Sequence, residues 1–229
     1  MRTSKGRRTP HVTVPAPRAG KEPVRGMSRP GLAARQALLD AAHELLRHKR
    51  KSQITLSEVS KRANVSRGST YFFYKDIEAL YASLLRSLEQ RLFEVLRAPL
   101  HQQVKTWQEI FEILLQRAVA YMRKDIVICE LAIGAHATPS LKAMDREADL
   151  LIADTFASQI ERVFELPALA KRSRVFFHAV EIGDLMFSLS MLEHGEITKE
   201  YAQEATRAAV AYLELYLPKR LPRIKSADR

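Results

Sequence analysis

Hydrophobic residues after Pro30 recur at three- and four-residue intervals, the spacing of amphipathic α-helices. In the clearest stretch, leucine occupies every fourth position until Pro99: Leu80, Leu84, Leu88, Leu92 and Leu96. No segment alternates hydrophobic and polar residues as a half-buried strand does. The pattern therefore predicts an all-α protein of about nine helices. We expect helices over about 31–48, 106–123, 126–136, 139–166, 168–194 and 199–217, two short helices opening at Thr55 and Ser66, and a longer one from Asp76 to Pro99.

Polar residues at the expected helix starts support these boundaries. Thr55-Leu56-Ser57-Glu58 and Thr106-Trp107-Gln108-Glu109 both fit the capping box. In that motif the threonine oxygen accepts from the N3 amide and the glutamate reaches back to the cap residue. Ser66 and Asp76 are also strong N-cap residues. The helix starts are therefore better defined by the sequence than the helix ends.

The two short helices that open at Thr55 and Ser66 cannot be stable alone. They make sense as a helix-turn-helix packed on the helix that precedes them. Asn64 is the best non-glycine candidate for the left-handed residue of the tight turn. Ser60 is small enough for the second helix to cross close over the first. Three residues supply the apolar contacts between the two helices: Leu56, Val59 and Val65.

The second short helix carries four consecutive aromatic residues between two cations, in the stretch NVSRGSTYFFYK over 64–75. Its N-terminal end presents Ser66, Arg67 and Ser69, and recognition helices point that end at base edges. Arg67 can donate two hydrogen bonds to a guanine or one to a phosphate. A helical period directs Tyr74 to the core and directs Tyr71, with at least one of its two phenylalanine neighbours, outward. The alternative, four core aromatics, leaves the flanking cations and caps unexplained.

The net charge of +11 is concentrated in the first third of the 229-residue chain. Residues 1–30 carry eight Lys and Arg against one acid, and residues 31–97 carry twelve against seven. Residues 98–229 carry seventeen against eighteen. A basic N-terminal region favours a polyanionic partner, nucleic acid first and an acidic membrane second. A solvated basic face without a partner is the alternative that charge alone leaves open.

Composition also divides the chain. Residues 1–30 hold five of the ten prolines and three of the eight glycines without periodicity, which predicts a disordered basic arm. Met27 is a candidate alternative start within it. We expect a helix-turn-helix domain over 31–78, a second helical domain over 79–218, and a basic tail over 219–229.

Enzyme, metal and membrane patterns are weak. The chain has no glycine-rich phosphate loop and no Cys-x-x-Cys pair. His43-Glu44-Leu45-Leu46-Arg47 misses the zinc-protease motif because Arg47 takes the second histidine position. No apolar stretch approaches the roughly 18 residues of a membrane span. The lone Cys129 excludes an internal disulfide and fits a reducing, intracellular compartment. We therefore expect no catalytic residues, no metal, no cofactor, no membrane partner and a cytoplasmic location.

The segment from Ile54 to Lys75, continuing to Leu80, resembles the DNA-binding signature of TetR-type transcriptional regulators. The resemblance covers about 45 residues, roughly 35–80. It implies an all-helical homodimer of about nine helices, in which 31–78 is the DNA-binding domain and 79–218 is the effector-binding and dimerisation domain. The implied function is sequence-specific regulation of transcription, with a repressor released from a pseudo-palindromic operator by a small molecule. The alternative is a helical-bundle enzyme or carrier with a trihelical head.

By similarity to that family, one group of side chains would contact the DNA backbone: Thr55, Tyr71, Phe73 and Lys75. A second group would lie over or near the bases: Ser66, Arg67, Ser69, Thr70 and Phe72. The sequence departs from the family pattern at three positions. Asn64 replaces a usual glycine, Tyr74 replaces a usual phenylalanine, and Ile77 replaces a frequent lysine that meets a phosphate. The last change removes one expected backbone contact.

The near-neutral half from residue 100 onward has nothing to attract DNA. Small residues on its last two long helices would let two chains approach closely, although packing within one chain is equally compatible with the spacing. These residues are Gly183, Ser190, Ala202, Ala205, Ala208 and Ala209. The family resemblance favours the homodimer. The helices over about 105–165 would enclose an apolar effector pocket lined by Trp107, Phe111, Gln116, Tyr121, Cys129, His136 and Phe156.

Overall fold

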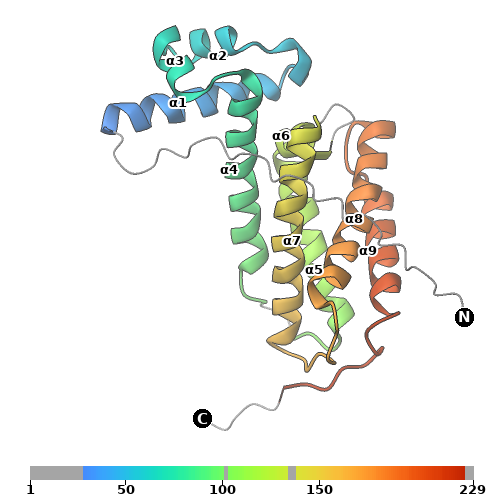
Figure 1. Cartoon of the computed structure of the whole chain (residues 1–229). Coiled ribbons are helices and arrows are strands. Elements are labelled where there is room, and N and C mark those ends of the chain that lie inside the picture. Colours follow the sequence, from blue (N-terminus) through green and yellow to red (C-terminus); the bar gives the residue numbers. More distant parts are fainter. Residues whose placement is uncertain (1–27, 101–102, 134–137, 225–229) are drawn as a thin grey trace, which may run out of the picture.

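The computed structural model describes residues 28–100, 103–133 and 138–224 (Figure 1). Over these residues every regular element is helical, which confirms the predicted fold class. Most of the predicted arm at 1–30, the end of the predicted tail at 219–229, and His136 lie outside the described residues.

Three helices form a small head at one end of the molecule (Figure 1). They are α1 (Arg29–Leu46), α2 (Leu56–Arg62) and α3 (Arg67–Phe73), with a 3₁₀ turn, η1 (Lys51–Gln53), between the first two. The next helix, α4 (Ile77–Arg97), begins in the head and runs down the length of the body (Figure 1). All five of its predicted leucines are buried. Because α4 is continuous, it ties the orientation of the head to that of the body.

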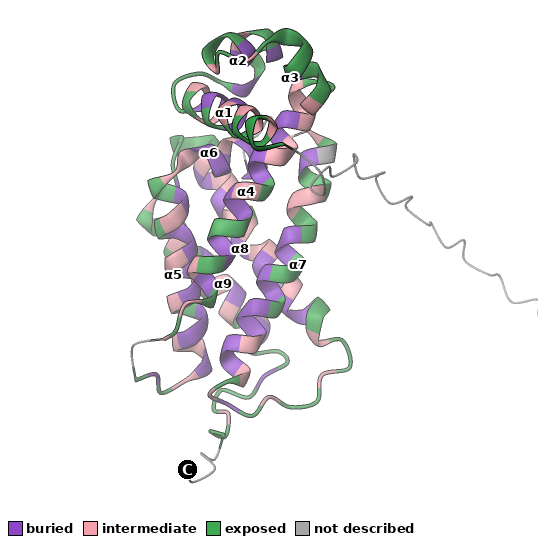
Figure 2. Ribbon diagram, turned by 90° about the vertical axis from the view of Figure 1, so that its left-hand side faces the viewer, coloured by how far each residue is buried: buried purple, intermediate pink, exposed green. Residues whose placement is uncertain are grey.

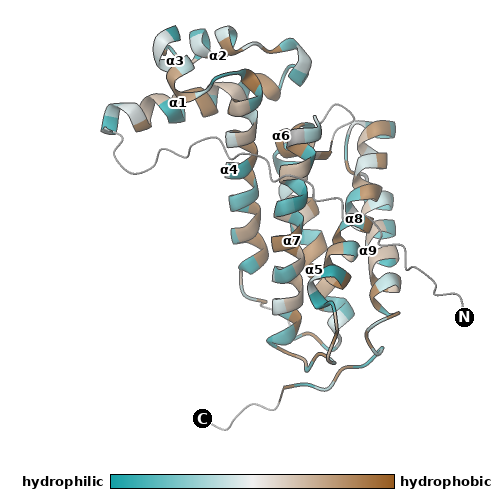
Figure 3. Cartoon of the chain, in the orientation of Figure 1, coloured by the Kyte–Doolittle hydropathy of each residue, from teal (hydrophilic) through white to brown (hydrophobic). Residues whose placement is uncertain are grey.

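The body is a bundle in which long helices run side by side with α4 (Figures 1 and 2). Its further elements are α5 (Trp107–Lys124), α6 (Ile126–Ile128), the π-helical η2 (Cys129–Ile133), α7 (Pro139–Glu161), α8 (Arg172–His194) and α9 (Lys199–Leu213). Buried residues follow the facing sides of these helices, whereas α3 is largely exposed (Figure 2). Hydropathy alternates along α4, α5 and α9, as expected for helices with one buried face (Figure 3).

The predicted caps form at the start of the helices. Thr55 Oγ1 accepts from the Glu58 amide at 3.2 Å, and Thr106 Oγ1 accepts from the Glu109 amide at 3.3 Å. The return half of the box at Thr55 is replaced by an ion pair, since the Glu58 carboxylate binds Lys49 at 2.6 Å. Each threonine still satisfies one amide that the helix itself leaves free.

Two predicted helix ends are wrong. Helix α7 ends at Glu161 and not near 166, and α9 ends at Leu213 and not near 217. The backbone after α7 pairs instead with the chain after α9. The Glu165 amide donates to the Pro222 carbonyl at 2.8 Å, and the Ile224 amide donates to the Val163 carbonyl at 3.0 Å. These long-range hydrogen bonds replace the next turn of α7.

Small residues let α8 and α9 cross closely within one chain. Ala205, Ala209 and Ser190 are fully buried. A Cβ at Gly183 would lie 3.7 Å from Leu115 of α5, so this glycine also faces the chain's own core. The prediction that these four residues lie between two chains is therefore wrong. Helix α8 is long and apolar enough to cross a membrane by length and composition, but it packs between α7 and α9 as a core helix does.

Candidate functional site

A tight turn between α2 and α3 holds the exposed face of the head. Asn64 adopts φ 52°, the left-handed conformation that the sequence predicts for it. Ser60 Oγ donates to the Val65 carbonyl at 2.8 Å, and the Val65 amide donates to the Ser60 carbonyl at 3.1 Å. Thr70 Oγ1 lies 3.1 Å from Ser60 Oγ and 2.9 Å from the Ser66 carbonyl. This buried cluster of polar groups fixes the angle between the two helices.

Thr70 was expected near the bases, and that expectation is wrong. Its side chain is fully buried, because the hydroxyl is bound to α2 and to the start of its own helix. Thr70 therefore positions α3 and cannot reach a ligand outside the fold. The helical period accounts for this: Thr70 follows Ser66 by four residues and lies on the face of α3 turned toward α2.

The N-terminal end of α3 projects polar groups outward. Ser66 caps the helix by accepting from the Ser69 amide at 3.1 Å, and its hydroxyl donates to Ser69 Oγ at 2.9 Å. The Ser69 hydroxyl therefore keeps its own proton free for a ligand. Arg67 is exposed, with one weak contact of 3.4 Å to Ser57 Oγ. A Cβ at Gly68 would meet nothing within 4 Å, so this glycine leaves open space on the outer surface.

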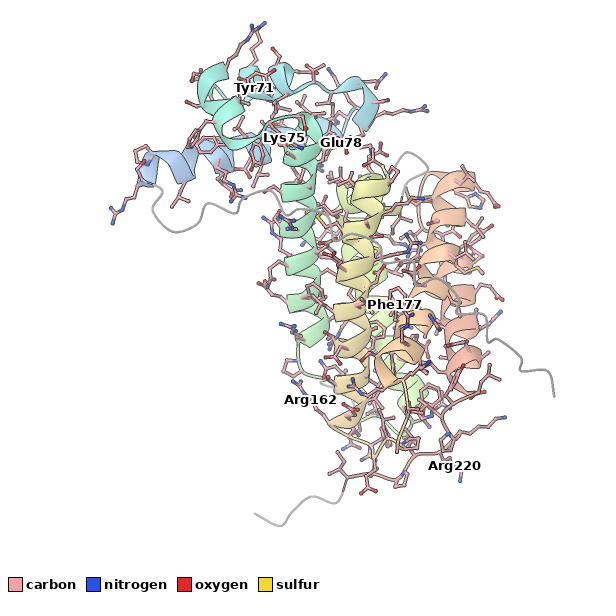
Figure 4. All side chains as sticks on the ribbon, viewed as in Figure 1. Tyr71, Lys75, Glu78, Arg162, Phe177 and Arg220 are labelled. Carbon is pink, nitrogen blue, oxygen red and sulfur yellow. The ribbon has the colours of Figure 1, made fainter. Side chains whose placement is uncertain are left out.

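The four aromatic residues separate as the helical period predicts. Tyr74 is 4% exposed, in the core, whereas Tyr71 is 57% exposed and Phe72 is 78% exposed. Phe73 is half-buried and meets the Phe72 ring edge to face at 5.4 Å. Tyr71 lies on the head, and Lys75 lies where the head joins α4 (Figure 4). The two most exposed rings, those of Tyr71 and Phe72, are neighbours in the sequence and lie on the outer surface of α3.

Polar contacts join the head to the body. His43 Nε2 of α1 lies 2.8 Å from Asp125 Oδ2, directly before α6. The Lys51 amide of η1 donates to Glu130 Oε1 of η2 at 3.2 Å, and the Tyr81 hydroxyl donates to the Lys51 carbonyl at 3.2 Å. The head therefore contacts the body through the segment over 125–133, in addition to α4.

The residues expected to line an apolar pocket do not line one together. Trp107, Phe111, Cys129 and Phe156 are buried in the packed core, where Phe111 and Phe156 meet edge to face at 5.0 Å. Tyr121 is half-buried and donates to the Leu88 carbonyl at 3.0 Å. Gln116 lies on the exposed side of α5 and donates to Glu112. Its predicted place in the interior is therefore wrong.

A hollow of about 380 Å³ lies elsewhere in the body, between α7, α8 and η2. Carboxylates dominate its polar lining: Asp145, Asp149, Glu181 and Asp184. No sequence motif marks these four residues as part of a binding or catalytic site. Their only signal in the sequence is spacing, since Asp145 and Asp149 share one helical face and Glu181 and Asp184 share another. Spacing does not reveal that the two faces meet.

Burial perturbs the acids of this hollow. It raises the pKa of Asp149 and of Asp184 well above the ordinary value, and neighbouring carboxylates raise both further. Burial and the charge of Glu181 raise the pKa of Asp145 to about 6. Burial also raises the pKa of Glu89, which faces the group from α4, to about 8. The region is therefore short of positive charge.

Two family models match the sequence. One, described as the tetR family of bacterial regulatory proteins, matches residues 38–84, which include the second half of α1, all of α2 and α3, and the start of α4. The other, described as a tetracyclin repressor-like C-terminal domain, matches residues 77–217, which include the whole bundle. No curated protein matches the sequence.

Several solved structures share the fold. A TetR-family transcriptional regulator from Streptomyces coelicolor has a TM-score of 0.61 and 19% identity, covering 81% of this chain and 98% of that chain. A TetR transcriptional regulator from Rhodococcus sp. RHA1 has a TM-score of 0.59 and 16% identity, covering 80% and 96%. SmeT, the repressor of the Stenotrophomonas maltophilia efflux pump SmeDEF, has a TM-score of 0.58 and 14% identity, covering 80% and 90%.

Proposed function

The chain belongs to the tetR family of bacterial regulatory proteins, and on that premise we propose that it is a repressor that leaves its operator when a small molecule binds the body. The observation that carries this proposal is the outward N-terminal end of α3. There Arg67, Ser69 and Tyr71 are all exposed, while the helix is anchored from beneath by Thr70 and Tyr74.

The side chains of the head divide into two roles toward DNA. Arg67 and Ser69 bear hydrogen-bond donors at the tip of α3, and Phe72 bears an apolar ring that suits a thymine methyl group. Ser66 assists as the cap that orients Ser69. We assign the contacts to the DNA backbone to Thr55, Tyr71, Phe73 and Lys75. Thr55 suits this role because its oxygen accepts the cap hydrogen bond and its proton remains free for a phosphate.

The operator contact requires a dimer, which is typical of the family. We place the interface on the outer side of α8 and on the turn that follows α9, because apolar side chains lie exposed there: Leu185, Leu192, Leu215 and Tyr216 are 55%, 69%, 76% and 45% exposed. A two-fold axis through this interface would set two recognition helices on two half-sites of a pseudo-palindrome, about 34–36 Å apart or a multiple of that spacing.

The effector binds the C-terminal bundle in this proposal. One similar structure is a complex of SmeT with triclosan, at a TM-score of 0.51 and 18% identity. In the present chain the apolar residues predicted to line the effector pocket pack against one another. An apolar effector would therefore have to separate packed side chains such as Phe111 and Phe156. Proteins of this family are transcriptional regulators and not enzymes. We infer the same for this chain, and we place it in the cytoplasm with its DNA.

The test is enrichment of genomic DNA fragments on the immobilised protein, followed by footprinting of the bound site. Arg67→Ala should weaken binding to that site by about 1–3 kcal/mol, and Tyr71→Ala should weaken it with less loss of sequence preference. The matched control is Arg91→Ala, which removes the same charge from an exposed position on α4 in the body. Equal affinity of the Arg67→Ala, Tyr71→Ala and unmodified proteins would refute the proposed role of α3.

A further inference from the structure

Three aspartates from two helices converge in the hollow of the body. Asp145 and Asp149 lie one turn apart on α7, and Asp184 faces them from α8. One carboxylate oxygen from each lies within 4.8 Å of the others. Oxygen atoms at such spacings can share one ion, because ligand oxygens lie about 2.0–2.6 Å from Mg²⁺ or Ca²⁺. Glu181, one turn from Asp184 on α8, lines the same hollow.

Acidic side chains around this group are buried, whereas the cations that act on them, Arg86 and Arg146, are exposed. Asp149 is 3% exposed, and Glu89 of α4 is 7% exposed. Glu89 Oε1 and Glu181 Oε1 are both buried, and neither has a hydrogen-bond partner among the described residues. Glu89 lies on α4, which packs against α7, and its charge and those of Asp145 and Asp149 are near enough to raise one another's pKa. A buried carboxyl oxygen without a partner is costly, and its persistence points to a ligand.

The cations within reach do not neutralise the group. Lys142 and Arg146 line the hollow, but both are exposed. Arg146 pairs with the outer oxygen of Glu181 at 3.4 Å and leaves the inner one unpaired. The Asp149 and Asp184 carboxylates lie close to each other, and no cation pairs with either among the described residues. The hollow is therefore built for more positive charge than the chain supplies.

We propose that Asp145, Asp149 and Asp184 bind a divalent metal cation in this hollow, with Glu181 at the edge of the ligand set. The class of cation follows from the donors. The side-chain oxygen donors that line the hollow are carboxylates and a serine hydroxyl, and no histidine or cysteine is among its described lining residues. An oxygen-only set suits Mg²⁺, Mn²⁺ or Ca²⁺ better than a metal that prefers nitrogen or sulfur. The volume of about 380 Å³ leaves room for water molecules in the remaining coordination positions.

The position of the hollow links it to the head. Its third wall is η2, which contributes Ala132 and Ile133. The same element holds Glu130, which accepts from the Lys51 amide of the head. A cation that draws α7 and α8 together against η2 would shift this contact. On this basis, and resting on the proposed function, the cation regulates operator binding.

The first measurement is the binding of Mn²⁺ to the metal-stripped protein. Binding is detected as the loss of the free-ion signal in electron paramagnetic resonance. We expect one site per chain. Asp149→Asn and Asp184→Asn should each weaken binding at least about tenfold, because loss of even an outer-shell partner costs that much at metal sites. Glu147→Gln is the control, since it removes one charge from an exposed position of the same helix. It should bind within twofold of the unmodified protein.

Thermal unfolding distinguishes a ligand site from a structural cluster. Without metal, Asp149→Asn and Asp184→Asn should melt no lower than the unmodified protein, because each removes a like charge from a buried group. Mn²⁺ should raise the melting temperature of the unmodified protein and of Glu147→Gln, and leave both aspartate variants unchanged. No Mn²⁺ binding, or binding that survives in both variants, overturns the metal site. A rise given by spermidine but not by Mn²⁺ assigns the hollow to an organic cation and also overturns it.

Operator affinity with and without Mn²⁺ tests the regulatory step separately. Mn²⁺ should change the operator affinity of the unmodified protein by at least about fivefold and should leave that of Asp184→Asn unchanged. If Mn²⁺ binds without changing operator affinity, the proposed metal site stands and its proposed regulation of DNA binding is wrong. Failure of the Arg67→Ala test leaves the Mn²⁺ measurement unaffected, so the two proposals fail independently.

Discussion

The turn at Asn64 offers a sharp test of how the head is built. Among the described residues it is the one non-glycine residue at positive φ, at 52°. An ordinary side chain in this region costs about 1–2 kcal/mol because Cβ crowds the following carbonyl. Asparagine tolerates the conformation better. Glycine avoids the clash but loses more backbone freedom on folding, by about 0.5–1 kcal/mol.

The clash at positive φ and the loss of backbone freedom predict different outcomes for alanine and glycine at this position. The Asn64 side chain is exposed and makes no hydrogen bond to a described residue, so its removal alone costs little. Asn64→Gly should therefore be close to neutral, and Asn64→Ala should destabilise the head by about 1 kcal/mol. The loss should be local, because the turn connects two helices of seven residues each.

Native-state hydrogen exchange of the α2–α3 peptides measures this local free energy. Since about 1.4 kcal/mol corresponds to a factor of ten, Asn64→Ala should speed exchange of the α3 amides about fivefold, and Asn64→Gly by less than about twofold. The amides of Thr70 and Tyr74 are suitable probes, because each donates to a carbonyl four residues earlier at 2.9 Å. Lys61→Ala, on the exposed side of α2, is the control. Equal exchange rates in the alanine and glycine variants would refute the strain argument.

Three further predictions follow from single side chains. Thr70→Val should lower the local stability of the head by about 1 kcal/mol in the same exchange measurement, through loss of the buried hydroxyl contact, while Ser69→Ala should leave stability unchanged and weaken operator binding. The Cys129 thiol should not react with a disulfide reagent at pH 8 until the protein is unfolded, because burial raises its pKa to about 12; rapid labelling of the native protein would contradict its placement. Leu192→Glu should shift the protein toward monomer in sedimentation at micromolar concentration, and an unchanged dimer would move the interface away from α8.

The sequence predicts the head well because its determinants are local. Caps at Thr55 and Ser66, the left-handed turn at Asn64 and the helical period of the aromatic run all act within a few residues. The prediction fails at Thr70, whose hydroxyl finds its partner at Ser60, ten residues away. A polar residue in a recognition helix is expected to face the ligand. Only the packing of α3 on α2 shows that this one serves the turn.

The end of α7 was predicted too far along the chain because nothing local stops the helix at Glu161. Phe164 pairs with Arg223, a residue nearly sixty positions later, and the backbone on each side follows. Helical periodicity cannot report such a contact, because the apolar residues after α7 continue the pattern while their amides bind another segment. Pro167, the one local signal, lies beyond the observed end.

The acidic hollow and the exposed apolar side chains of α8 both reflect the weak amphipathicity of this helix, which can be recognised in the sequence. Hydrophobic and polar positions divide clearly around α4 and α5, but hardly at all around α7 and α8. A helix that covers a core with one face and meets water with the other should show the division. Helix α8 departs from this because it presents acids such as Asp184 inward and apolar side chains such as Leu192 outward. Both arrangements are costly in an isolated chain, and each becomes favourable only when a partner supplies the missing charge or covers the apolar surface. A long helix with weak amphipathicity in an otherwise amphipathic bundle is therefore a signal of two binding surfaces, which on α8 are the proposed cation site and the proposed dimer interface.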